Sequence, residues 1–192
     1  GHDVTICSRG QKTTHQQDIP GDLRTITCDK NVEQDVASAL EQAYDVAIDS
    51  VPTVESIGYI AKHARELKHY LHCGSTGGYA PLSHVPGDET MPYDHFCGGW
   101  AQKADADNKA LTLRAEQGFP ATVIRPSYIT GPGMLPLDNI GGRRADFVDD
   151  ILNNVELDLP ENGLSLLHPV HVRDLGRSFL LAAQRPEIAI GE

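Results

Sequence analysis

The sequence contains no long hydrophobic run and has few positive charges. No stretch of its 192 residues approaches the roughly 18 consecutive apolar residues that a membrane span requires. Lys and Arg number 16 against 27 Asp and Glu, which gives a formal net charge of −11 at pH 7. Proteins that hold the phosphate backbone gain affinity from Lys and Arg. We therefore expect neither a membrane nor a nucleic acid as partner, although a short basic groove stays open.

The chain also lacks clustered cysteines and a convincing metal-ligand pattern. Its cysteines show no CxxC spacing, which is typical of reduced thiols in a cytoplasmic protein and leaves two disulfides as the minority interpretation. Two histidine pairs, His69/His72 and His168/His171, are each three residues apart. Residues at that spacing on a strand face opposite sides, so we predict no metal site.

Short apolar segments alternate with helical patterns along the chain. This alternation predicts an α/β fold, a doubly wound parallel sheet with helices on both faces. A long helix is expected over roughly 100–117, and a final helix is expected to begin with Asp174 as its N-cap. The five predicted strands, expected to form one parallel sheet, are 4–7, 23–28, 45–49, 69–73 and 121–125.

A glycine-rich dinucleotide motif is missing as well. Nucleotide-binding α/β sheets begin with a central strand and a Gly-rich turn that holds the pyrophosphate, but no GxGxxG or GxxGxxG is present. We expect an interior piece of a longer protein, with a strand missing between 4–7 and 45–49. Because each unpaired buried backbone group costs about 1–3 kcal/mol, we expect that slot to be filled by another segment or chain, or the strands to rearrange.

Four stretches carry a family resemblance. They are Gly1-His2-Asp3-Val4-Thr5 with Ser8-Arg9-Gly10, Cys73-Gly74-Ser75-Thr76-Gly77-Gly78-Tyr79, Arg125-Pro126-Ser127-Tyr128-Ile129-Thr130-Gly131-Pro132-Gly133, and His171-Val172-Arg173-Asp174-Leu175. In them the chain resembles the extended short-chain dehydrogenase/reductases, the NAD-dependent epimerase/dehydratases. Its detail is most similar to the atypical branch that includes the chloroplast stem-loop-binding proteins. The resemblance implies an NAD(P)-binding Rossmann-like domain over 1–125, without its first strand and Gly-rich loop, and substrate-lobe elements with a returning helix over 126–192.

The resemblance also implies a cofactor site. In the family the loop after the second strand selects the cofactor, and here it carries Ser8 and Arg9 without an acid, which favours NADP over NAD. Asp29 is similar to the acid that contacts the adenine amino group, although a helix N-cap would explain it nearly as well. Pro126 and Tyr128 are expected to contact the cofactor. Tyr128 stands where many sugar-nucleotide epimerases carry Asn.

For the reaction itself the resemblance implies Ser75 and Lys103 as catalytic residues, both also in contact with the cofactor. Thr76, Tyr79 and Arg125 are expected to contact the substrate. The glycines around Ser75 would allow a close backbone approach, although this segment is also simply a good turn.

The chain departs from the family at the catalytic tyrosine. In the family a Tyr stands four residues before the Lys on one helix, and the Lys charge lowers the Tyr pKa so that the phenolate can act as a base. Here Gly99 stands four residues before Lys103, and none of the six tyrosines has a Lys at that spacing. Tyr79 or Tyr93 could supply a phenol from a loop, but nothing in the sequence shows it.

These observations favour an NAD(P)-binding epimerase, dehydratase or reductase-like protein that acts on a small polar substrate, with a nucleotide-linked sugar as one candidate. The alternative is a non-catalytic binding module of the same fold, for RNA, a protein partner or a sensed dinucleotide. A small-molecule substrate is the expected partner, and a homodimer stays open.

Overall fold

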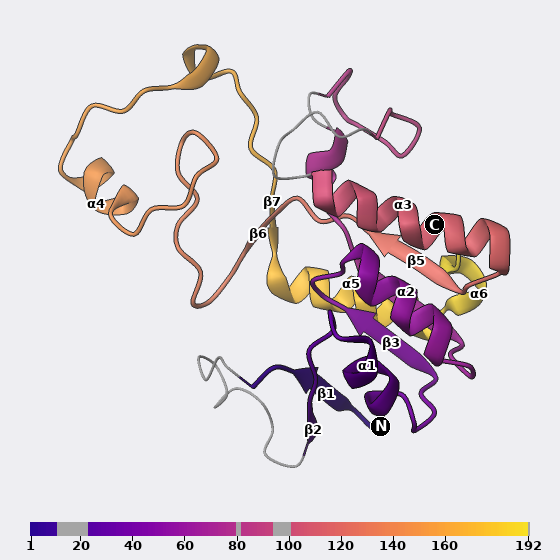
Figure 1. The fold of residues 1–192 in the computed structure, drawn as a ribbon. Helices are drawn as coiled ribbons and strands as arrows, with labels where there is room; N and C mark the ends of the chain where they lie inside the picture. Colours follow the sequence, from indigo (N-terminus) through magenta and orange to yellow (C-terminus); the bar gives the residue numbers. More distant parts are fainter. Residues whose placement is uncertain (11–22, 80–81, 94–100, 192) are drawn as a thin grey trace.

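Parallel strands and intervening helices make up most of the structure, a computed structural model that describes residues 1–10, 23–79, 82–93 and 101–191 (Figure 1). The confirmed α/β architecture follows the predicted alternation. Its elements, in chain order, are β1 (Thr5–Ser8), β2 (Arg24–Thr27), α1 (Glu33–Ala39), β3 (Val46–Asp49), α2 (Val54–His63), β4 (His69–Cys73), the 3-10 turn η2 (Thr76–Tyr79), α3 (Ala101–Gln117), β5 (Ala121–Ile124), β6 (Tyr128–Thr130), α4 (Phe147–Leu152), η4 (Pro160–Gly163), β7 (Pro169–His171), α5 (Val172–Gln184) and α6 (Pro186–Ala189).

All strand pairs in the described sheets are parallel, as predicted, but the five predicted strands do not form one sheet. β1 pairs only with β2, while β3, β4 and β5 form a separate three-stranded sheet in that order. A third sheet joins β6 and β7. The expectation of one continuous sheet is therefore wrong for these strands. The physical reason is the one anticipated from the sequence: no described strand lies between β1 and β3 to join their edges by backbone hydrogen bonds.

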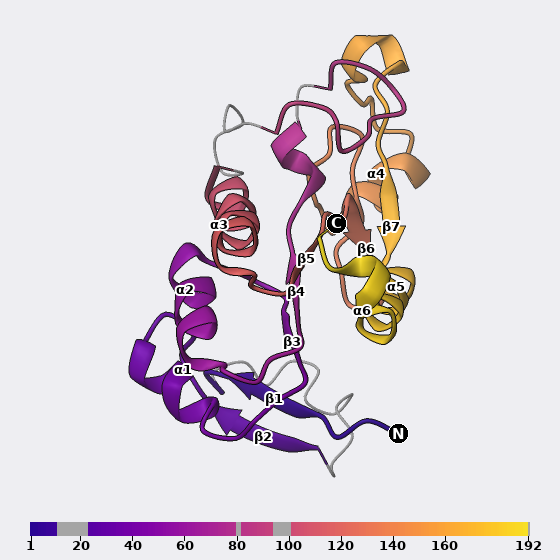
Figure 2. The same cartoon turned by 90° about the vertical axis from the view of Figure 1, so that its right-hand side faces the viewer.

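Helices cover both faces of the three-stranded sheet, as the doubly wound class requires (Figure 2). Alternation along β4 decides which side chain faces which layer. Tyr70 packs with Ile57 of α2 and Ala110 of α3, whereas Leu71 packs on the opposite face with Phe179 of α5. Since every residue of β4 is buried, this strand is the centre of the core.

Local signals set the helix boundaries. Thr53 begins α2 with a reciprocal capping box, in which its hydroxyl accepts from the Ser56 N–H and its own N–H donates to the Ser56 hydroxyl. Gly118, at φ +69°, ends α3 where the sequence predicted. The prediction that Asp174 is the N-cap of the helix that begins there, α5, is wrong. His171 is the N-cap, because its side chain accepts from the Arg173 N–H, and Asp174 lies inside the first turn.

The segment from β6 to β7 extends away from the sheet as a long arm that carries α4 and η4 (Figure 1). Several of its apolar side chains are exposed, among them Leu152 at 72%, Leu164 at 77% and Leu166 at 78%. Within the described ranges no helix has the length and apolar character that crossing a membrane requires.

Candidate active site

The carboxyl ends of β4 and β5 bring two of the predicted site segments together. Cys73 lies in register with Ile124, so the chain emerges from the two strands side by side at Ser75 and Arg125. A pocket of about 600 Å³ opens there, and we call it the serine pocket. Its lining includes five of the predicted site residues: Ser75, Thr76, Tyr79, Arg125 and Tyr128.

Backbone contacts hold the Ser75 turn against the start of the lobe. Thr76 donates to the Pro126 carbonyl from its N–H at 3.1 Å and from its hydroxyl at 3.3 Å. The Ser75 hydroxyl oxygen accepts from the Gly77 N–H at 3.1 Å, which leaves its proton free for another acceptor. Pro126 is outside the described lining of the pocket and acts here through its carbonyl oxygen.

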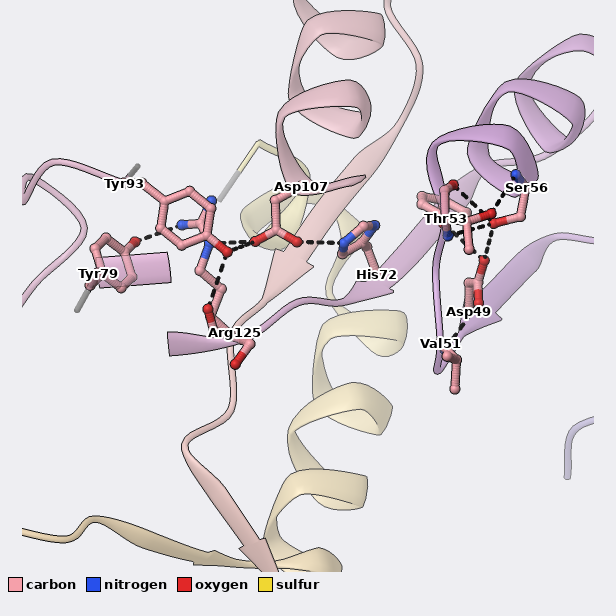
Figure 3. A network of polar contacts seen from close by, with 11 residues as sticks. Asp49, Val51, Thr53, Ser56, His72, Tyr79, Tyr93, Asp107 and Arg125 are labelled. Carbon is pink, nitrogen blue, oxygen red and sulfur yellow. Dashed lines mark hydrogen bonds and ion pairs between the residues drawn. The ribbon is translucent and has the colours of Figure 1, made fainter. Parts of the chain in front are cut away.

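A buried carboxylate, Asp107 of α3, organises the wall behind this pocket (Figure 3). Its Oδ1 lies 2.6 Å from Nε2 of His72, and both side chains are fully buried. Its Oδ2 accepts from the Tyr93 hydroxyl at 2.7 Å and from Nε of Arg125 at 2.8 Å. One carboxylate therefore joins α3, β4, the residue after β5 and Tyr93 of the segment between η2 and α3.

Arg125 is fixed on three sides. Besides Asp107, its Nη1 donates to the Tyr79 hydroxyl at 2.7 Å. The guanidinium lies 4.2 Å from the centre of the Tyr93 ring and 5.4 Å from that of Tyr79, and the two rings meet edge to face at 4.8 Å. A cation held over aromatic faces and paired with a carboxylate is strongly oriented.

The electrostatics of this network assign proton positions. Burial by itself raises the pKa of Asp107, but hydrogen bonds from His72, Tyr93 and Arg125 outweigh it and hold the pKa below its usual value. Burial, and then the hydrogen bond to Asp107, raise the pKa of Tyr93. Tyr93 is therefore a neutral donor to Asp107 and to the Ser75 carbonyl, at 3.1 Å, and its environment is the reverse of what a catalytic base needs.

Two glycines of the Ser75 segment make room for the network. A Cβ on Gly74 would lie 2.5 Å from Oδ2 of Asp107, and one on Gly78 would lie 2.2 Å from a Tyr93 ring carbon. In the structure, the close approach expected of these glycines is thus made by the protein's own side chains.

The predicted cofactor residues at the start of the chain line a second pocket of about 590 Å³, between β1 and β3. We call it the strand-gap pocket. Ser8, Arg9 and Asp29 lie on its wall together with Lys30 and with Tyr44, whose hydroxyl is buried without a hydrogen-bond partner among the described residues. Cations, hydroxyls and a carboxylate are the kinds of group that bind a dinucleotide, although apolar side chains of α1 and β3 line much of the pocket and the Lys30 ammonium donates to the Val51 carbonyl.

Asp29 is not a helix N-cap. Its Oδ1 accepts from the Asn31 N–H at 3.0 Å, while the N-cap position of α1 is Val32, which has no capping side chain. The alternative explanation for Asp29 is therefore wrong, and its second carboxylate oxygen makes no hydrogen bond to the described residues.

Lys103 lies in the first turn of α3 and lines neither pocket among the described residues. Burial raises the pKa of the Cys73 thiol, and the positive charge of Lys103 offsets part of that rise. The ammonium has no hydrogen bond to a described residue. Gly99, where the family tyrosine would stand, is outside the described residues.

Sequence reasoning missed Asp107, and one signal could have found it. Asp107 shares a helix face with Ala104 and Ala110, both completely buried. A carboxylate on an alanine face of a covering helix must be buried, and a buried carboxylate needs partners. The lining residues Asp88, Glu89 and His168 of the serine pocket were also missed.

The fold is a Rossmann-like α/β fold, with one pocket at the carboxyl ends of β4 and β5 and the other between β1 and β3. A model of the NAD dependent epimerase/dehydratase family matches residues 31–191. The chain therefore belongs to this family. No curated protein sequence matches the chain significantly.

Solved structures with the same fold come from several organisms. Pal from Bacillus thuringiensis is 20% identical, covering 94% of this chain and 66% of its own, with a TM-score of 0.74. A dTDP-glucose 4,6-dehydratase from Streptomyces venezuelae, solved with NAD bound, is 17% identical, covering 94% and 62%, with a TM-score of 0.73. A UDP-N-acetylglucosamine 4-epimerase from Methanobrevibacter ruminantium, in complex with UDP-N-acetylmuramic acid, is 15% identical, covering 95% and 65%, with a TM-score of 0.70. This chain thus spans 62–66% of the length of these structures.

Proposed function

We propose that this chain forms the NAD(P)-binding and substrate-binding core of an epimerase, dehydratase or reductase that acts on a small polar substrate of the nucleotide-sugar class. The observation that carries the proposal is the pair of pockets, one between β1 and β3 and the other at the carboxyl ends of β4 and β5. One pocket carries Ser8, Arg9 and Asp29, and the other carries Ser75 and Thr76. Two structurally similar proteins are a dehydratase and an epimerase named for nucleotide sugars, which supports this substrate class.

Each pocket offers different groups to a ligand. The strand-gap pocket offers Asp29 as an acceptor for an amino or hydroxyl group and Arg9 as a partner for phosphate. The serine pocket offers the free protons of Ser75 and Tyr79 as donors to a substrate oxygen, since the Tyr79 oxygen already accepts from Arg125. When bound, a nicotinamide dinucleotide supplies the hydride acceptor or donor for such chemistry.

The finer proposal is a preference for NADP. It rests on Arg9 and on the absence of an acid in the loop after β1, because a guanidinium suits a 2′-phosphate and a carboxylate suits a free ribose hydroxyl. Lys30 adds a second cation to the same pocket.

Protection of the intact protein from thermal unfolding by NADPH or NADH tests both claims, that the protein binds a nicotinamide dinucleotide and that it prefers NADP. We expect greater protection by NADPH, and loss of that preference, with NADH protection kept, in Arg9→Ala. Arg65→Ala, in the turn after α2, is the matched control and should keep the preference. No protection by either nucleotide contradicts cofactor binding, whereas equal or greater protection by NADH contradicts only the NADP preference.

The second candidate is a dinucleotide-binding module without turnover, favoured by Gly99 in place of the family tyrosine. We expect Gly99→Tyr in the intact protein to create or raise hydride transfer from NADPH to a keto sugar nucleotide, while nucleotide binding stays unchanged. If the wild-type protein already turns over well and Tyr79→Phe abolishes that activity, the proton relay has moved to Tyr79 and the degenerate-site interpretation is wrong.

An RNA partner has less support. The only adjacent pair of arginines, Arg143 and Arg144, is engaged within the arm: Arg143 donates to backbone carbonyls and Arg144 pairs with Asp150. Cytoplasmic location, a small-molecule partner and a homodimer belong to the same proposal, and gel filtration of the intact protein tests the last of these.

A further inference from the structure

The serine pocket is built from segments that are far apart in the sequence. Ser75 and Tyr79 follow β4, Arg125 follows β5, and Tyr93 lies in the described segment 82–93, between η2 and α3. Asp107 ties two of these segments directly, because it accepts from Tyr93 and from Arg125, and Arg125 in turn donates to Tyr79. Other contacts between the segments are the Thr76 bonds to the Pro126 carbonyl, the bond from the Tyr93 hydroxyl to the Ser75 carbonyl, and the edge-to-face contact of Tyr93 with Tyr79.

We propose that Asp107 is the positioning residue of the serine pocket: through Tyr93 it sets the Ser75 turn, and through Arg125 it sets the Tyr79 hydroxyl. Calling the pocket a substrate site rests on the proposed function, whereas the positioning role rests on this geometry alone.

The first route runs through Tyr93. Its hydroxyl lies 2.7 Å from Oδ2 of Asp107 and 3.1 Å from the Ser75 carbonyl oxygen. A hydroxyl has one proton, so the strong bond to the carboxylate and the weaker one to the carbonyl share it, and the position of the phenol is set by the carboxylate. The Ser75 carbonyl also accepts from the Gly78 N–H at 3.4 Å, which places the phenol against the turn that presents the Ser75 hydroxyl.

The second route runs through Arg125. Asp107 takes the Nε edge of the guanidinium, which orients Nη1 toward the Tyr79 oxygen at 2.7 Å. With its oxygen lone pair engaged, the Tyr79 hydroxyl directs its proton elsewhere, and Tyr79 is part of the pocket wall. The network is neutral overall when His72 donates from Nε2 as the neutral imidazole, because one carboxylate then faces one guanidinium.

His72 locks the carboxylate itself. Its Nε2 lies 2.6 Å from Oδ1 of Asp107, on the side of the carboxylate opposite Tyr93 (Figure 3). The carboxylate also packs closely against Gly74, where an added Cβ would come within 2.6 Å of both oxygens. Asp107 thus has one oxygen bonded to His72 of β4 and the other bonded to Tyr93 and Arg125.

Hydrogen exchange of the whole chain tests this assignment without any ligand. In Asp107→Asn we expect the amides of residues 76–78, which bond to Ser75 or Pro126, to exchange about tenfold faster or more, because local opening frees them. The matched control is Asp49→Asn, the same change in the other polar network of Figure 3, where Asp49 accepts from Ser56 and from the Val51 N–H. It should speed exchange near 51–56 and leave 76–78 unchanged.

Tyr93→Phe keeps the carboxylate and the ring but removes the hydroxyl. It therefore tests the positioning role of Asp107 through Tyr93 even if Asp107→Asn does not fold. We expect faster exchange at 76–78 with β3, α2 and α3 unchanged. Unchanged exchange at 76–78 in Tyr93→Phe, or an equal rise across the whole core in a folded Asp107→Asn, overturns the positioning role. Because the cofactor test uses the other pocket and a different readout, failure of the proposed function would be seen separately.

Discussion

Gly78→Ala should destabilise the protein through one collision. The Cβ would lie 2.2 Å from one Tyr93 ring carbon and 2.3 Å from another, closer than nonbonded carbons approach. Gly78 does not have a left-handed φ, so alanine brings no backbone strain of its own. The ring has to move, and it carries a bond to the Asp107 carboxylate, a bond to the Ser75 carbonyl and the cation–π contact with Arg125.

The size of the effect follows from those contacts. A hydrogen bond to a charged group contributes about 1.5–3 kcal/mol, and a partly buried cation–π contact about 0.5–2 kcal/mol. Partial loss of both predicts a decrease of about 2–4 kcal/mol in the free energy of unfolding, a large share of the roughly 5–15 kcal/mol of a typical domain. Gly58→Ala in α2 is the matched control. Its Cβ would meet no atom within 4 Å, so it should instead stabilise by about 0.5–1 kcal/mol.

Urea denaturation of the two variants measures both changes, and a double-mutant cycle identifies the cause. Tyr93→Ala removes the ring, so Gly78→Ala should cost almost nothing in that background. A loss of the same size with and without the ring would refute the collision as the reason.

Two further predictions concern charge and packing. The pKa of Asp107 is lowered in the fold, so its contribution is complete above the unfolded value of about 4 and fades as the pH falls through the folded value. Asp107→Asn should therefore cost about 3–5 kcal/mol at pH 7 and less toward pH 2; thermal melts across this range check it, and an equal loss at both ends contradicts it. Phe179→Ala should cost about 3–5 kcal/mol in urea denaturation, because Phe179 packs in the core with Leu71 and Cys73. Leu180→Ala, at a side chain 46% exposed, should change stability by less than about 0.5 kcal/mol, and similar losses in the two variants would contradict the assigned core.

The first five strands could be predicted from the sequence because each has a short apolar pattern that needs no distant information, whereas β6 and β7, three residues each, were not predicted. The predicted strand at 69–73 coincides with β4, although two of its five residues are histidines. The sequence indicated a missing strand between β1 and β3, but not how the remaining strands pair without it. Pairing of β1 with β3 depends on what lies between them, and a periodicity within each strand carries no information about that.

The serine pocket was predictable as far as strand ends were concerned. Ser75 and Arg125 each follow a parallel strand, and such ends meet at one sheet edge. The Asp107 network was not predicted, because its partners are 14, 18 and 35 residues away in sequence. Contacts at those separations are set by the sheet register and by the seating of α3, not by local spacing.

The two pockets differ in how the chain holds them. The serine pocket lies where β4 and β5 are joined by one hydrogen-bonded ladder and by Asp107. The strand-gap pocket has Ser8 on the β1–β2 sheet and Asp49 on the β3–β4–β5 sheet, and no ladder among the described strands joins the two. NADPH and NADH share every group except the 2′-phosphate, so contacts with the shared groups contribute equally to the protection by either nucleotide. The difference between their thermal protections, rather than the size of either, therefore reports the contribution of Arg9.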